Sequence, residues 1–181
     1  KLFASSLGER CGEEDIYRAR TPRGPVYAAT FSALALVAGH GLLAFRDPHA
    51  IRPMVFGEKE ENGRKSYIFA SETVVLDLLG YNLIKNLEPG EAIYVDNNLR
   101  TNSIIIDRRE RKHCMFEWVY FARADSVVEG ISVYNARLNL GVKLAELFEQ
   151  SADIVMPVPD TSIPSSIALV EKKNLRYREG V

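Results

Sequence analysis

The segment from Ser132 to Lys172 constrains the fold more than any other, because helical and strand patterns alternate along it. Its first part predicts a helix over Ser132 to Gln150, with apolar residues at helical spacing: Val133, Ala136, Leu140, Leu144 and Leu147. The apolar run Ile154 to Val158 predicts a buried strand, and Ile163 to Lys172 predicts a second helix. Helix, strand, loop and helix in this order is typical of an α/β domain with a parallel sheet.

The earlier part of the chain predicts a layered α+β domain instead. Apolar runs over residues 26–37 and Leu42 to Phe45 flank Gly39-His40-Gly41, which indicates a hairpin. Further short strands are expected at Met54 to Phe56, Tyr67 to Ala70, Tyr81 to Leu87 and Ala92 to Val95. Ser71-Glu72 begins a short helix that Gly80 ends in a left-handed conformation. We therefore predict two parts, residues 1–100 and residues 101–181.

Composition excludes several classes of protein. Hydrophobic residues make up 46% and charged residues 26% of the 181 residues, the balance of a soluble globular protein. The net charge of -1 provides no general attraction for nucleic acid or an anionic membrane, and the longest apolar run is too short to span a bilayer. Cys11 and Cys114 match no metal or redox spacing, which favours a reduced, cytoplasmic setting.

The loop between Met156 and Pro164 is the segment best suited to chemistry. An apolar strand ends there, a helix begins, and Asp160, Thr161 and Ser162 lie between them. Ligands of open α/β sheets bind beyond the carboxyl ends of strands, so these side chains could hold phosphate oxygens or a magnesium ion. Alternatively, Ser162 only caps the helix and Asp160 only complements its dipole. Residue types alone favour this second interpretation.

Several strings of residues, taken in order, resemble the amidophosphoribosyltransferase family. The most specific runs from Phe116 to Ser126, followed by Ile131-Ser132-Val133-Tyr134 and Ala136-Arg137. The other strings are Gly39-His40-Gly41, Ala44 to Pro48, Ile51-Arg52-Pro53, Ala70-Ser71-Glu72, Leu87 to Tyr94 and Pro157 to Ser162. The resemblance covers the chain from about Tyr27 to its last residue.

This resemblance implies a glutamine-dependent pentosyltransferase of de novo purine synthesis. Family members join an N-terminal-nucleophile glutaminase domain to a phosphoribosyltransferase domain, and use magnesium, glutamine and phosphoribosyl pyrophosphate to make 5-phosphoribosylamine. Residues 1–100 would be the second half of the layered α+β glutaminase part. Residues 101–181 would be the linker and the start of the α/β transferase with its parallel sheet. The resemblance also implies a homo-oligomer with purine nucleotides as feedback inhibitors.

The resemblance assigns the loop to substrate but places most catalytic groups elsewhere. Thr161 matches a position associated with magnesium, and Asp160 and Ser162 would help bind pyrophosphate, so the functional interpretation becomes the favoured one. The nucleophile cysteine is expected before Lys1, which leaves no catalytic residue here. We therefore expect a fragment that releases no ammonia from glutamine and that associates through uncovered sheet edges.

Three further residues have both a functional and a plain interpretation. Tyr120 matches a tyrosine where the two active sites of relatives communicate, or is a half-buried aromatic in a strand. Arg137 matches an allosteric arginine, although an ion-paired arginine on the helix surface is favoured. Cys114 aligns with a ligand of the iron–sulfur cluster of one family branch, but we expect no cluster and a buried or half-buried free thiol.

Two departures from the family pattern indicate a divergent member. His49 and Ala50 stand where the family usually has Asn-Gly, and so lose an easy positive φ. Ala124 stands where the family has proline, which costs no polar group. Two alternative functions remain: a different phosphoribosyltransferase fused to an unrelated layered domain, or a non-catalytic allosteric or dimerisation module.

Overall fold

The computed structural model describes residues 31–180, which divide into two compact units that interleave along the chain. Unit 1 contains residues 31–51 and 87–112, and unit 2 contains residues 52–86 and 113–180. The part of the predicted first hairpin before Phe31, and Cys11, lie outside the described residues. The assignment of residues 1–100 and 101–181 to a glutaminase and a transferase part stays a prediction.

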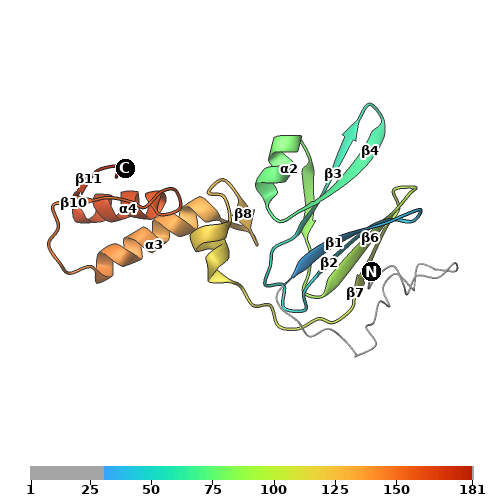
Figure 1. Cartoon of the computed structure of the whole chain (residues 1–181), viewed down its shortest axis with the longest axis horizontal. Helices are drawn as coiled ribbons and strands as arrows, with labels where there is room; N and C mark the ends of the chain where they lie inside the picture. The colour runs from blue at the N-terminus through green and yellow to red at the C-terminus, as the bar shows by residue number, and fades with distance from the viewer. Residues whose placement is uncertain (1–30, 181) are drawn as a thin grey trace. The chain divides into compact units, whose positions relative to one another are not determined.

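Unit 1 is built on one antiparallel sheet (Figure 1). Its strands, in the order in which they pair, are β1 Ser32–Val37, β2 Gly41–Arg46, β6 Glu91–Asp96 and β7 Thr101–Ile105. The predicted hairpin is confirmed where it is described, since β1 and β2 pair from Ser32 and Arg46 to Val37 and Gly41. Leu43, Ala92 and Tyr94 form the core beneath this sheet.

In the turn after β2, Ala50 adopts a positive φ. This conformation is costly for alanine and would be easy for the glycine that the family usually has there. Ala50 has φ 51° and is 1% exposed, so a residue with a side chain occupies the left-handed region. Asp47 stabilises the turn, because its carboxylate accepts hydrogen bonds from His49 N at 2.9 Å and Ile51 N at 2.9 Å. Arg46 closes the turn by donating to Ala50 O at 2.8 Å. The sequence departs from Asn-Gly, yet the backbone keeps its positive φ.

Replacing Asp47, which is 3% exposed, by alanine is expected to lower the free energy of unfolding by about 2 kcal/mol, because two partly buried N–H groups lose their acceptor. Asp96→Ala is the matched control, since the Asp96 carboxylate also accepts from two backbone N–H groups, but both bonds are exposed. Water replaces that acceptor, so the control should lose less than about 1 kcal/mol. Urea unfolding measures both, and equal losses would contradict the role given to Asp47.

The first part of unit 2 is a three-stranded antiparallel sheet with one short helix. Its elements are β3 Val55–Glu61, β4 Arg64–Ala70, α2 Thr73–Leu79 and β5 Asn82–Asn86, paired in the order β4-β3-β5. All four were predicted, but β3 and β4 are longer than expected, since only Asn62 and Gly63, both with positive φ, separate them. Gly80 ends α2 with φ 71°, as predicted, whereas Glu72 stands at the N-cap without a side-chain capping hydrogen bond, so the cap expected from Ser71-Glu72 is wrong. Leu76 of α2 lies over Gly57, whose missing Cβ would stand 2.7 Å from the leucine side chain.

The second part of unit 2 is mainly helical. Its elements are the π-helix η1 Glu117–Phe121, the strands β8 Val127–Val128 and β9 Ile131–Ser132, then α3 Val133–Leu147, β10 Ile154–Val155, α4 Ile163–Lys173 and β11 Arg176–Tyr177. β10 lies within the predicted strand and pairs in parallel with β11, which was not predicted, with Ile154 opposite Arg176. β10 is shorter than the predicted strand, because Pro157 and Pro159 have no N–H to donate. Within residues 31–180, no helix is both long and apolar enough to cross a lipid bilayer.

The buried face of α3 differs from the apolar stripe in the sequence. Leu140, Leu144 and Leu147 are 40%, 49% and 79% exposed, so most of the apolar stripe is not the buried side of the helix. The buried residues of α3 are Val133, Arg137, Gly141 and Ala145. Gly141 decides this orientation, because α4 approaches so closely that only a residue without a side chain fits.

Candidate functional site

The β10–α4 loop lies where a ligand site of an α/β sheet is expected. It follows the carboxyl end of β10, which runs parallel to β11, and leads directly into α4 (Figure 1). Asp160 is exposed, and Thr161 and Ser162 are partly exposed. The three predicted residues therefore lie together at an open strand end, and none is inside a packed interior.

Hydrogen bonds inside the loop involve Ser162 and the backbone. The Ser162 hydroxyl donates to Val158 O, and its carbonyl accepts from Ser166 N at 2.9 Å. Ser162 stands at the N-cap of α4, but its side chain accepts no capping hydrogen bond. The interpretation in which this side chain caps the helix is therefore wrong. Ser162 instead closes the loop on itself, which limits how far its neighbours move.

Asp160 and Thr161 have the donor chemistry that a magnesium–phosphate ligand needs. Within residues 31–180, neither side chain has a hydrogen-bond partner, so both are available at the loop surface. Mg²⁺ is usually held by one or two protein carboxylates together with substrate phosphates, rather than by a full protein cage. The same described residues contain no group of three or more His, Cys, Asp and Glu side chains placed for a metal. One carboxylate and one hydroxyl therefore fit a metal that arrives with its substrate.

Tyr120 lies in a π-helix and not in a strand. Its side chain is 62% exposed, so the plain interpretation of a half-buried strand residue is wrong. Phe121, 52% exposed, contacts it edge to face at 5.6 Å between ring centroids, and Phe116, 62% exposed, lies 6.2 Å from Phe121 between ring centroids. We call Phe116, Tyr120 and Phe121 the aromatic surface.

Arg137 is buried, so the expectation of a surface arginine in an ion pair is wrong. It is 3% exposed, and its guanidinium donates to Trp118 O at 2.8 Å and to Ala122 O at 2.7 Å. Burial lowers the pKa of Arg137, and the charge of Glu72 opposes that shift. Its family-based role toward nucleotides stays a prediction. In this structure the side chain donates hydrogen bonds to backbone carbonyls in and directly after η1.

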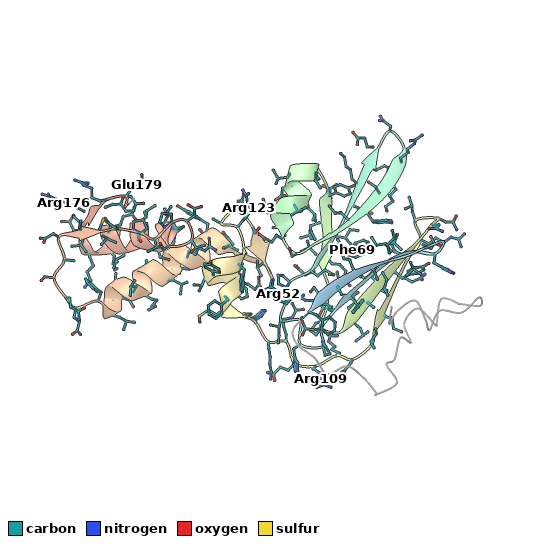
Figure 2. All side chains as sticks on the ribbon, in the orientation of Figure 1. Arg52, Phe69, Arg109, Arg123, Arg176 and Glu179 are labelled. Carbon is teal, nitrogen blue, oxygen red and sulfur yellow. The ribbon has the colours of Figure 1, made fainter. Side chains whose placement is uncertain are left out.

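Two acidic residues that sequence reasoning missed anchor the same region. Glu117, 3% exposed, pairs with Arg52, which is labelled in Figure 2 and also lies over the Phe121 ring at 5.0 Å. Glu72 accepts hydrogen bonds from Arg123 N and Ser126 Oγ, each at 2.8 Å. The charged residue between aromatic neighbours in Phe116-Glu117-Trp118 is the sequence signal that could have identified Glu117.

The remaining candidate ligands have ordinary environments. Cys114 is a half-buried free thiol, as expected, and the absence of a cluster stays a prediction. His113 contacts the Trp118 ring edge at 5.4 Å between centroids, and His40 is an exposed turn residue. His49 is less exposed than expected for a loop, because its Nδ1 donates to Glu110 O at 2.8 Å.

Comparisons with known proteins agree with the resemblance in the sequence. No family model matches the chain. It is 41% identical to the amidophosphoribosyltransferase of Pseudomonas aeruginosa over 175 residues, covering 93% of this chain and 35% of that protein. It is 37% identical to the Escherichia coli amidophosphoribosyltransferase, covering 99% of this chain and 38% of that protein. The chain thus spans about a third of the length of these relatives.

A solved structure extends the similarity to the fold. The glutamine phosphoribosylpyrophosphate amidotransferase of B. subtilis, solved with ADP and GMP, matches with a TM-score of 0.80 and 28% identity, covering 98% of this chain and 37% of that one. These matches cover both sides of residue 100, which gives no support to an unrelated first domain. Over the third of their length that it spans, this chain is similar in sequence and in fold to amidophosphoribosyltransferases.

Proposed function

We propose that the protein containing this chain is an amidophosphoribosyltransferase that converts glutamine and phosphoribosyl pyrophosphate to 5-phosphoribosylamine, glutamate and pyrophosphate. The supporting observation is the match to such enzymes over nearly the whole chain, together with the open β10–α4 loop at a strand end. The proposal includes a role in purine synthesis, a cytoplasmic location and a homo-oligomeric state. It also assigns residues 1–100 to the glutaminase part and residues 101–181 to the linker and the start of the transferase part.

In the proposed reaction, ammonia forms a bond to C1 of the ribose while the bond from C1 to pyrophosphate breaks. The β10–α4 loop would bind the departing pyrophosphate. Mg²⁺, when bound, neutralises the developing phosphate charge. The Asp160 carboxylate would orient the metal, and the Thr161 hydroxyl would contact the metal or a phosphate oxygen. Ser162, which donates to Val158 O, would hold this loop in shape.

Thr161→Val is expected to raise the KM for phosphoribosyl pyrophosphate by about tenfold or more, since a hydrogen bond to a charged group contributes about 1.5 kcal/mol or more. The whole protein is assayed for pyrophosphate release with ammonia as nucleophile, which isolates the transferase step. Thr101→Val makes the same change on the exposed strand β7 and should leave the KM unaltered. An unaltered KM in Thr161→Val would remove this loop from substrate binding, and a wild-type protein without pyrophosphate release would refute the proposed function.

Regulation by purine nucleotides is part of the same proposal. The B. subtilis enzyme was solved with ADP and GMP, and a second structural match, with a TM-score of 0.80, is described as the allosteric regulatory enzyme of purine biosynthesis. Tyr120, exposed on η1, would lie where the glutaminase and transferase sites communicate. Arg137 would influence nucleotide response through η1, because its donors bind backbone carbonyls there.

A further inference from the structure

The π-helix η1 has an unusual hydrogen-bond register at its carboxyl end. Ala122 N donates to Glu117 O at 3.0 Å, five residues back. In an α-helix the same N–H would donate to Trp118 O, four residues back. Single π-turns of this kind are rare and occur frequently at functional sites. Something must therefore satisfy the Trp118 carbonyl and keep Ala122 N away from it.

Arg137 supplies that donor. Its Nε donates to Trp118 O at 2.8 Å and its Nη2 donates to Ala122 O at 2.7 Å, so one guanidinium binds two carbonyls at the end of η1. Arg137 is 3% exposed, so solvent has little access to its guanidinium. Loss of these hydrogen bonds would therefore be costly, because water could not readily replace them. With Trp118 O already bonded, Ala122 N is left to bond Glu117 O.

Glu72 supplies a hydrogen-bond acceptor for the backbone N–H that follows η1. If the helix continued, Arg123 N would donate back into η1, but it donates instead to Glu72 Oε2 at 2.8 Å. The same oxygen accepts from Ser126 Oγ at 2.8 Å, and Ser126 is 1% exposed, so this carboxylate is fixed in place. The helix therefore ends at Phe121, and Ala122 leaves it with extended backbone angles.

We infer that Arg137 and Glu72 are positioning residues that hold η1 in its π register and so fix the orientation of the aromatic surface. A return to the α register would rotate Tyr120 and Phe121 relative to Phe116, because a π-turn contains one residue more than an α-turn. The surface would lose its present ring contacts, with Tyr120 and Phe121 at 5.6 Å and Phe116 and Phe121 at 6.2 Å between centroids.

The register can be measured directly in the unaltered chain. Through-hydrogen-bond NMR couplings identify which carbonyl accepts from Ala122 N. We expect a coupling to the Glu117 carbonyl and a coupling from Arg123 N to the Glu72 side chain. A coupling from Ala122 N to the Trp118 carbonyl would overturn the inference, and this result does not depend on whether any variant folds.

Arg137→Met tests the cause, because methionine fills a similar space and donates no hydrogen bond. Trp118 is the chain's one tryptophan and lies inside η1, so its fluorescence reports on this helix alone. We expect Arg137→Met to shift the emission of Trp118 and to abolish the coupling from Ala122 N to Glu117. Arg123→Met is the matched control, since the Arg123 side chain is exposed and its hydrogen bonds are to Asp125, two residues away, while the backbone N–H that binds Glu72 is kept. An unchanged emission and coupling in folded Arg137→Met would overturn the inference.

The consequence for catalysis rests on the proposed function. In the whole protein, wild type should form glutamate and release pyrophosphate in equal amounts, whereas Arg137→Met should form more glutamate than pyrophosphate, because Tyr120 is displaced. Equal amounts of glutamate and pyrophosphate in Arg137→Met would show that the register of η1 does not affect how the two reactions are coupled. A wild type that releases no pyrophosphate would refute the proposed function instead, and the NMR and fluorescence results would still decide the register.

Discussion

Replacing Gly141 by alanine is expected to lower the free energy of unfolding by about 3 kcal/mol, the upper part of the usual range for overpacking. An added Cβ would stand 2.1 Å from Ser165 O and 2.8 Å from the Ser165 carbonyl carbon and Cα. These are backbone atoms of α4, which cannot rotate away as the end of a flexible side chain does. Separating the helices would also break the hydrogen bond from Ser165 Oγ to Arg137 O, at 2.8 Å.

The sign of this effect distinguishes packing from helix propensity. Alanine favours a helix over glycine by about 1 kcal/mol, so propensity alone predicts that Gly141→Ala is stabilising. Asn139→Ala is the control, because Asn139 is an exposed residue of the same helix and its change tests propensity without a steric contact. Urea unfolding followed by circular dichroism measures both variants. Stabilisation of Gly141→Ala would mean that α3 and α4 do not meet at Ser165.

Arg52→Met is expected to cost about 3 kcal/mol, at the low end for a broken buried pair, since Arg52 itself is partly exposed. The side chains of Arg52 and Glu117 are 38% and 4% exposed, so removal of the arginine leaves a buried carboxylate without its cation. Glu117→Met should cost less, because water can reach the arginine that remains. The two single variants and the double variant, measured by urea unfolding, give the coupling between the side chains.

The exposed pair Lys143–Glu146 provides the comparison for Arg52 and Glu117. Its side chains are 74% and 47% exposed, and water and salt screen such exposed pairs, so this pair should contribute little to stability. The side-chain hydrogen bond from Lys143 is the largest cause of the lowered pKa of Glu146. The stability contributed by this pair is therefore present above the ordinary pKa of a glutamate and is lost as pH falls through the lowered value. Equal costs for Lys143→Met and Arg52→Met would contradict the buried role of Glu117.

Local signals in the sequence predicted the secondary structure well. Gly80 ends α2 in the left-handed conformation, as its position after an apolar run predicted. This effect depends on residues within a few positions of each other, so spacing alone reveals it. The loop that holds Asp160, Thr161 and Ser162 was found in the same way, from an apolar run followed by polar residues and a helix start.

Signals that depend on distant residues were missed or misread. The stripe of Leu140, Leu144 and Leu147 suggested a core-facing side of α3, but these leucines are exposed. Nothing near Arg137 in the sequence indicates that its guanidinium binds carbonyls 15 and 19 residues earlier. Similarly, Glu72 and Arg123 are 51 residues apart, and Arg52 and Glu117 are 65 residues apart.

The sequence by itself therefore determined the helices, most of the strands, the loop at the end of β10 and the resemblance to a family, because these depend on local spacing and on ordered strings of residues. Only the tertiary structure decided which face of α3 is buried, and that Arg137 and Glu72 form hydrogen bonds with backbone groups in and after η1. The physical reason is that a buried polar group must find a partner wherever the fold provides one, and that partner is rarely a neighbour in sequence.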